Sequence, residues 1–178
     1  MRSSLKSRHY ADLLLKLGET QDALEPVYRS MVNFYASYKT QPELKALLAS
    51  KKVSSDDKIQ VLNAVYADLH PICQVFIAQL GEERDLKYLG QIVQSLEHAF
   101  YQRSDQVKVH VVSTGQLSEA TADRIQEVVK SVTSRKADFS SEVNADILGG
   151  LTLRVGNTIL DGSLSSKLAR IRQSLVQS

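Results

Sequence analysis

The feature that most constrains the fold of this chain is a change in the spacing of its apolar residues at Gln106. Before Gln106, apolar residues recur every three or four positions, the spacing that gathers them on one face of an α-helix. After it, the stretch VKVHVVST alternates apolar and polar residues, which is typical of a half-buried strand. The sequence therefore predicts an α-helical domain over residues 1–105 and a small α+β domain over residues 106–178.

Six helices joined by short polar turns are expected in the first region, which favours a six-helix bundle. Pro42 and Pro71 fit the first turns of the third and fifth helices, where a proline costs no helical hydrogen bond. Ser54, with Asp57 three residues later, is expected to cap the fourth helix. Gly18 is expected to end the first helix as a C-cap. On that first helix the apolar residues that fall near one face are Leu5, Tyr10, Leu13, Leu14 and Leu17.

The second region is expected to contain a strand from Gln106, a helix capped by Ser118 and a second strand within residues 138–147. The strands GLTLRV and TIL follow, joined by Gly156-Asn157, a pair that tolerates a tight turn. From about Ser163 an amphipathic helix closes the chain, with Leu164, Leu168, Ile171 and Leu175 along one side. Alternation in the strand predicts that this helix packs on Leu151, Leu153 and Val155, whereas Arg154 points to the opposite face.

Composition excludes several classes of protein. No stretch approaches the roughly 18 apolar residues of a membrane span, and the amino end lacks the pattern of a signal peptide. A cytoplasmic protein is therefore expected. The single cysteine, Cys73, rules out an internal disulfide, and its apolar neighbours predict a buried, inert thiol. The net charge of +2 is too small to indicate nucleic-acid binding by itself.

The sequence contains no strong motif of a catalytic or metal-binding site. The four histidines have no metal-ligand spacing, and the pairs Asp56-Asp57 and Glu82-Glu83 fit helix ends better than a desolvated catalytic site. Gly149-Gly150 is not part of a phosphate loop. Ser163 has no nucleophile elbow around it, so Asp161 or Ser163 is expected to cap the last helix. No catalytic, metal or cofactor residue is assigned, and binding to other proteins is the function that remains.

The stretch GGLTLRVGNTILDGSLSSKLARIRQSL, residues 149–175, closely resembles the carboxyl-terminal signature of the delta subunit of F-type ATP synthases. The mitochondrial counterpart in this family is the oligomycin-sensitivity-conferring protein. Tyr10-Ala11 also fits the Tyr-Ala of the family's first helix, and the order of elements and the length agree over essentially the whole chain. Two departures stand in the signature itself: Asn157 replaces the usual Asp, and Ser165-Ser166 replaces an Arg-Gly pair. The signature residues with geometric roles are Gly149, Gly150, Gly156, Asp161, Gly162 and Ser163.

The resemblance implies a non-catalytic subunit in the peripheral stalk of a proton-translocating ATP synthase, present once per complex. It would lie on the cytoplasmic side of the inner (plasma) membrane without inserting into it. The helical domain would hold the amino-terminal helices of the alpha subunits, and the smaller domain the carboxyl ends of the b subunits. Holding both would prevent the catalytic head from turning with the rotor, so that proton-driven rotation is coupled to ATP synthesis. No cofactor is implied.

For the alpha subunits we expect an apolar groove between the first and fifth helices. The alternative is that the same residues merely fill the core of the bundle. The expected groove residues are Tyr10, Ala11, Leu14, Val75 and Gln79.

For the b subunits we expect a basic face, although a solvated surface explains the same residues without a partner. Its residues are Arg154, Lys167, Arg170 and Arg172. A second functional class uses the same basic terminal helix: a regulatory nucleic-acid-binding module. Salt dependence distinguishes the two, because nucleic-acid affinity falls steeply between low and moderate salt.

Overall fold

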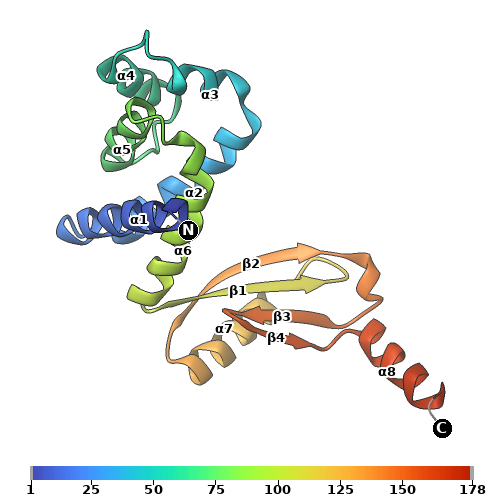
Figure 1. Ribbon diagram of the computed structural model, residues 1–178. Helices are drawn as coiled ribbons and strands as arrows, with labels where there is room; N and C mark the ends of the chain where they lie inside the picture. Colours follow the sequence, from blue (N-terminus) through green and yellow to red (C-terminus); the bar gives the residue numbers. More distant parts are fainter. Residues whose placement is uncertain (1, 177–178) are drawn as a thin grey trace. The chain divides into compact units, whose positions relative to one another are not determined.

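The computed structural model describes residues 2–176, without the side chains of residues 2–4, 171 and 174–176 (Figure 1). The chain forms two compact units, Met1–Arg103 and Ser104–Ser178. The first is helical and the second contains a small mixed sheet. In the described residues the two units together contain eight α-helices, six of them in the first unit.

The first unit also contains a short 3-10 helix, η1, directly before its last α-helix. Its elements are α1 (Arg2–Thr20), α2 (Leu24–Thr40), α3 (Pro42–Ala49), α4 (Ser55–Val65), α5 (Pro71–Glu82), η1 (Leu86–Tyr88) and α6 (Leu89–Arg103).

Local sequence signals explain several of these boundaries. The Ser54 side chain accepts a hydrogen bond from the Asp57 amide at 3.2 Å and caps α4, as the sequence predicts. Pro42 and Pro71 stand in the first turns of α3 and α5. The prediction for Gly18 is wrong, because α1 continues to Thr20. A side chain on Gly18 would lie 3.3 Å from the Cα atom of Leu24, so the glycine permits the start of α2 to approach closely.

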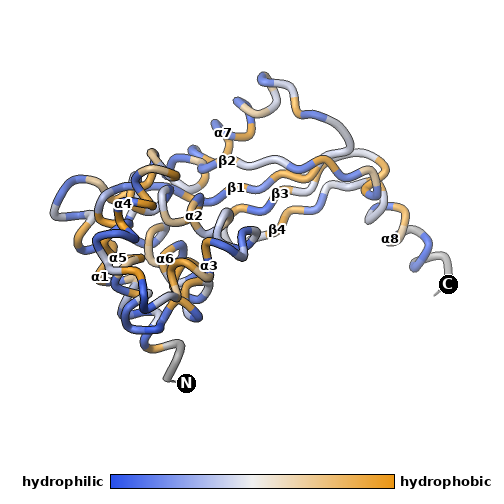
Figure 2. Tube along the Cα trace, turned by 90° about the horizontal axis from the view of Figure 1, so that it is seen from above, coloured by the Kyte–Doolittle hydropathy of each residue, from blue (hydrophilic) through white to orange (hydrophobic). Residues whose placement is uncertain are grey.

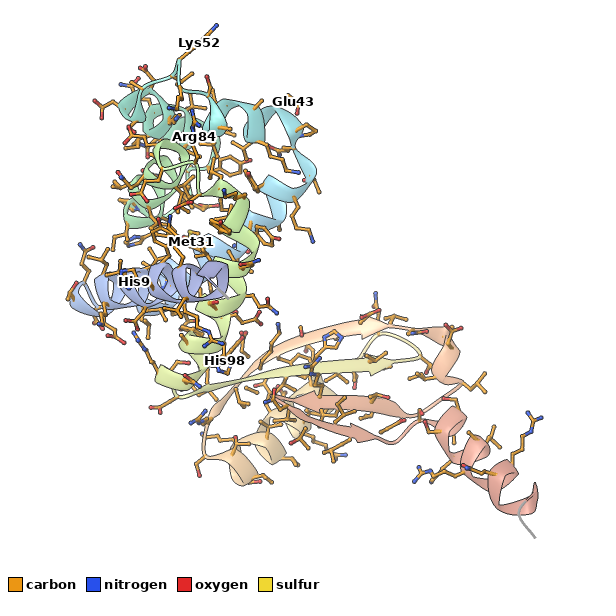
Figure 3. The ribbon with its side chains drawn as sticks, viewed as in Figure 1. His9, Met31, Glu43, Lys52, Arg84 and His98 are labelled. Atoms are coloured by element: carbon orange, nitrogen blue, oxygen red, sulfur yellow. The ribbon has the colours of Figure 1, made fainter. Side chains whose placement is uncertain are left out.

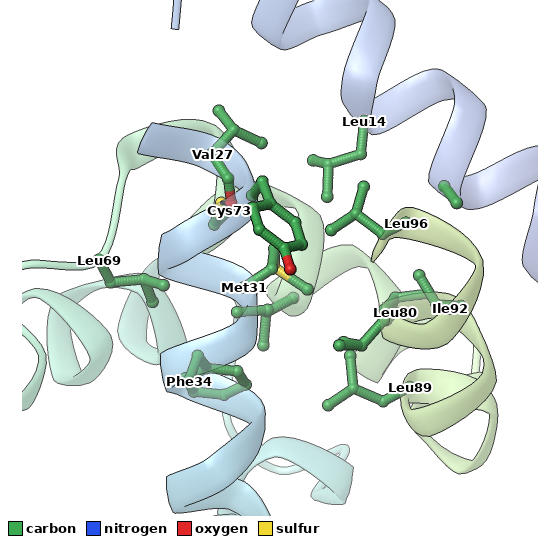
Figure 4. Close-up of a cluster of buried hydrophobic side chains, with 14 of the residues drawn as sticks. Leu14, Val27, Met31, Phe34, Leu69, Cys73, Leu80, Leu89, Ile92 and Leu96 are labelled. Atoms are coloured by element: carbon green, nitrogen blue, oxygen red, sulfur yellow. Dashed lines mark hydrogen bonds between the residues drawn. The ribbon is translucent and has the colours of Figure 1, made fainter. Parts of the chain in front are cut away.

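The core of the first unit is built from all six helices and from the segments between them (Figure 4). The rings of Tyr28 and Phe100 stack with centroids 4.1 Å apart. Cys73 is buried, as expected, and burial raises the pKa of its thiol to about 12. Labelled members of the cluster in Figure 4 are Leu14, Val27, Met31, Phe34, Leu69, Cys73, Leu80, Leu89, Ile92 and Leu96.

A fragment of residues 1–105 is therefore expected to fold alone, because its core cluster is supplied by its own helices. The expected result is a cooperative thermal transition followed by far-ultraviolet circular dichroism. A fragment that melts without cooperativity would mean that residues after 105 complete this core.

The second unit has four strands in the order β2-β1-β3-β4. Its elements are β1 (Gln106–Ser113), α7 (Glu119–Thr133), β2 (Lys136–Val143), η2 (Ala145–Ile147), β3 (Leu151–Val155), β4 (Thr158–Asp161) and α8 (Leu164–Val176). Strands β1 and β2 are parallel and joined through α7, whereas β3 is antiparallel to both β1 and β4. Val155 pairs with Thr158, so Gly156-Asn157 forms a two-residue hairpin loop, with Gly156 at φ 56°.

One face of this sheet is covered by α7, which begins at its Ser118 cap, as expected. Val109, Val111 and Leu153 from the strands pack with Val129 of α7. Leu151 and Val155 join the same cluster, and Arg154 is exposed, so the predicted alternation along β3 is confirmed.

The predicted packing of the last helix on this face is wrong. The side chains of Leu164 and Leu168 are 48% and 57% exposed, and α7 occupies the face where they were expected. Figures 1 and 2 show α8 leading away from the end of the sheet. The side chains of Ile171 and Leu175, the other two residues of the expected stripe, lie outside the described residues.

Candidate interaction surfaces

In the first unit, Tyr10 joins α1 to the end of α5. Its hydroxyl lies 2.5 Å from Glu83 Oε2 and 2.7 Å from Asp85 Oδ2, so it can donate to either carboxylate. Its ring meets Phe76 edge to face, with centroids 5.9 Å apart. These contacts come from residues more than sixty positions apart in sequence, and together they fix the side of α1 that faces α5.

Asp85 is the buried member of this cluster and forms an ion pair with Lys6. Burial alone would raise the pKa of Asp85, but the hydrogen bonds from Lys6 and Tyr10 outweigh it and lower that pKa below its ordinary value. Hydrogen bonds from Tyr10 and Gln79 likewise lower the pKa of Glu83. Burial, followed by the two carboxylates, raises the pKa of the Tyr10 phenol. Glu83 and Asp85 are thus ionised at neutral pH, whereas the Tyr10 phenol keeps its proton and can donate it to them.

Apolar side chains lie exposed beside Tyr10. Leu13 and Leu17 follow it by three and seven residues, which places them on the same side of α1, and they are 42% and 50% exposed. On α5, Val75 is 59% exposed, and Gln79 follows it by one turn. We call Tyr10, Leu13, Leu17, Val75 and Gln79 the α1–α5 surface.

Two residues of the expected groove do not belong to this surface. Ala11 and Leu14 are 1% and 0% exposed and are part of the core cluster. In the free chain they therefore lie beneath the α1–α5 surface, as the core alternative holds for them. The exposed apolar side chains of this part of α1 are instead those of Leu13 and Leu17, which lie away from its buried face. That buried face consists of Ser7, Ala11, Leu14, Leu15 and Gly18.

In the second unit, the glycine-rich signature shapes the junction between β4 and α8. Gly150 has φ 77°, and a side chain there would lie 2.4 Å from the carbonyl oxygen of Gly162. The Gly162 amide donates to the Leu151 carbonyl at 3.0 Å, and the Leu164 amide donates to the Gly149 carbonyl at 2.9 Å. Residues 149–151 and 162–164 therefore lie against each other, and there is no room for a side chain on Gly150.

Asp161 is the centre of the polar contacts at this junction. Its carboxylate accepts hydrogen bonds from the Ser163 amide at 2.9 Å, the Ser166 hydroxyl at 2.5 Å and the Thr152 hydroxyl at 3.3 Å. These bonds, that of Ser166 first, hold the pKa of Asp161 far below its usual range. The Ser163 hydroxyl accepts from the Ser166 amide at 3.3 Å and is itself buried. Asp161 and Ser163 thus both form hydrogen bonds that cap the start of α8, as the sequence predicts.

The four expected basic residues come from two elements. Arg154 projects from β3 on the face away from α7, and its Nε atom donates to the Gly156 carbonyl at 3.2 Å. Lys167, Arg170 and Arg172 are exposed along α8, where Arg170 Nε donates to the Ser166 carbonyl.

A metal centre is not found in the described part of the chain. No group of three or more His, Cys, Asp or Glu side chains could hold a metal ion there. His9 and His98 come from α1 and α6 (Figure 3), and His110 contacts Ser140 and Glu142 on the sheet.

No helix within residues 2–176 is long and apolar enough to cross a membrane.

Known proteins resemble this chain over nearly its whole length. The model of the family described as "ATP synthase delta (OSCP) subunit" matches residues 7–175. The ATP synthase subunit delta of Synechocystis sp. is 30% identical over 175 residues, which cover 97% of this chain and 95% of that protein. The subunit delta of Carboxydothermus hydrogenoformans is 25% identical, over 98% and 99% of the two chains.

The fold has a counterpart in a solved structure. A chain in the cryo-EM structure of the Toxoplasma gondii mitochondrial ATP synthase hexamer superposes with a TM-score of 0.68 at 18% identity, covering 96% of this chain and 97% of that chain. The likeness extends over both units and agrees with the matches in sequence. The resemblance seen in the signature is thereby confirmed, and this chain belongs to the ATP synthase delta (OSCP) subunit family.

Proposed function

We propose that this chain is a non-catalytic subunit of an F-type ATP synthase that clamps the catalytic head to the peripheral stalk. The helical unit holds the amino-terminal helices of the alpha subunits, and the smaller unit holds the carboxyl ends of the b subunits. Membership of the delta (OSCP) family supports the assignment to this complex. In this role the chain is present once per complex, peripheral to the cytoplasmic side of the inner membrane, and uses no cofactor.

The observation that carries the proposal is the α1–α5 surface. Leu13, Leu17 and Val75 present apolar side chains to solvent. Gln79 and Tyr10 both donate hydrogen bonds to Glu83, which adds a polar and charged group to this surface. An amphipathic helix that lays its apolar face on such a surface gains affinity from each buried side chain. A carboxylate at the rim, Glu83, favours a basic residue at the matching end of the bound helix.

The mechanical reason for two binding units is torque. Rotation of a central rotor does work on the head only if the head is held still, so the holding subunit must bind head and stalk at the same time. Slow dissociation at both ends is the physical requirement, and buried helix contacts supply it.

Val75→Asp is expected to weaken binding of a synthetic peptide of the alpha-subunit amino terminus by about tenfold or more, because the new carboxylate must be desolvated in the interface. Fluorescence anisotropy of the labelled peptide with the full-length chain measures the effect. The matched control is Val65→Asp on α4, since Val65 is similarly exposed, at 63%. Equal affinities for Val75→Asp and the wild type would remove α5 from the interface.

The family match and the relatives give no support to the nucleic-acid alternative. That alternative requires a fluorescent duplex to bind the chain at low salt and to dissociate steeply as the salt concentration rises.

A further inference from the structure

The last helix begins at the end of the sheet, and the two apolar side chains described on it, Leu164 and Leu168, are exposed. Only its start is fixed to the rest of the unit in the described contacts: the Leu164 amide bonds to Gly149, and the hydroxyl of Ser166 bonds to Asp161. Leu168, one turn further on, is 57% exposed. The β4–α8 junction therefore sets the direction in which α8 leads away from the sheet (Figure 1), and Leu168 is accessible to another molecule.

The spacing of the apolar residues on α8 is that of a coiled coil. Leu164, Leu168, Ile171 and Leu175 are separated by four, three and four residues, the d-a-d-a pattern of two heptads. In this register Lys167 is a g position and Arg172 an e position, the two kinds of position that flank the seam between paired helices. Arg170 is a c position, away from the seam.

Charge decides which kind of helix can pair with this seam. Leu164–Val176 contains three basic residues and no acidic one. In a parallel pair of two copies, the g residue of one helix faces the e residue five positions later in the other, so Lys167 would meet Arg172 twice. An antiparallel pair would also bring like charges together. A second copy of this chain is therefore disfavoured, and a helix with acidic flanks is favoured.

We propose that α8 binds its partner as one strand of a short coiled coil, the partner being a helix with an apolar a/d seam flanked by Glu or Asp. The inference rests on the proposed function in one respect: the partner helix is the carboxyl-terminal part of a b subunit. It differs from a general basic face, because Lys167 and Arg172 contribute to the pairing and Arg170 does not.

The test uses the full-length chain and three probes. Two are synthetic three-heptad peptides with Leu at a and d, one with Glu and one with Lys at all e and g positions, which prevents each from pairing with itself. The third is the soluble carboxyl-terminal segment of the b subunit from the same organism. Affinity is measured by fluorescence anisotropy at two salt concentrations, and circular dichroism checks each variant's helix content.

The double variant Lys167→Glu with Arg172→Glu is expected to bind the Glu-flanked peptide and the b segment about tenfold more weakly, and to bind the Lys-flanked peptide in preference. Arg170→Glu, on the same helix, is the matched control and should change either affinity by less than about twofold. Leu168→Ser should lower both affinities at low and high salt alike, because it removes apolar contact at the seam.

The outcomes separate the two proposals. If the b segment binds the wild type but is indifferent to the double variant and to Leu168→Ser, the coiled-coil inference is wrong and the proposed function stands. If only the Glu-flanked peptide follows the expected pattern and the b segment does not bind, the proposed stalk partner is wrong and the seam stands. Equal losses for Arg170→Glu and the double variant would mean that a diffuse basic face, and no seam, attracts the partner.

Discussion

Replacing Ala11 by Trp is expected to lower the free energy of unfolding of the helical unit by about 3 kcal/mol or more, or to prevent its folding. Ala11 is 1% exposed and lies on the face of α1 that also buries Ser7 and Leu14. Ser7 Oγ is 3.3 Å from Gln91 Oε1 of α6, so the two helices approach closely along this face. A close-packed core has no space for an indole ring without displacing a helix.

Thermal unfolding followed by circular dichroism at the helical band measures this effect. Ala36→Trp provides the control, because Ala36 is exposed on α2 and the same ring there meets solvent. A melting temperature for Ala11→Trp equal to that of Ala36→Trp would show that Ala11 is accessible. That result would restore Ala11 to the residues proposed to line a groove for the alpha subunit.

The second large effect is expected for Gly150→Ala, which should destabilise the second unit by about 2–3 kcal/mol. At φ 77° a Cβ atom is strained by the backbone itself. The new atom would in addition lie 2.4 Å from the carbonyl oxygen of Gly162, a backbone atom that cannot rotate away. The junction of β3, β4 and α8 must therefore open to accommodate it.

Amide hydrogen exchange of Leu151, Leu153 and Leu164 measures this opening, because faster exchange at these positions reports local unfolding. Gly115→Ala is the matched control: a Cβ atom at Gly115 meets nothing within 4 Å. Equal protection in the two variants would contradict the close approach of Gly150 and Gly162. The β4–α8 junction would then not be what fixes the direction of the terminal helix.

The elements of this chain could be predicted because their signals are local. The change of period at Gln106 separates helices from strands, and hydroxyl side chains at Ser54 and Ser118 reach amides only three residues away. The two-residue loop at Gly156-Asn157 likewise depends on its own backbone geometry. Such signals do not depend on what packs above or below them.

The faces of the helices could not be predicted as well, since apolar residues of α1 occupy more than one face. Leu13 and Leu14 are adjacent and equally apolar, yet the first is 42% exposed and the second is fully buried. The choice is made by α2 and α6, which approach along the small residues Ser7, Ala11 and Gly18. The sequence of α1 by itself does not indicate where α2 and α6 will lie.

By itself, therefore, the sequence determined the order of the elements, the alternation along β3 and the family to which the chain belongs. Only the tertiary structure decided that Tyr10 meets Glu83 and Asp85, and that α7 covers the sheet where α8 was expected. The physical reason is the range of the interactions. Caps, turns and periodicity act within about one helical turn, whereas burial depends on which distant segment arrives to exclude water from a surface.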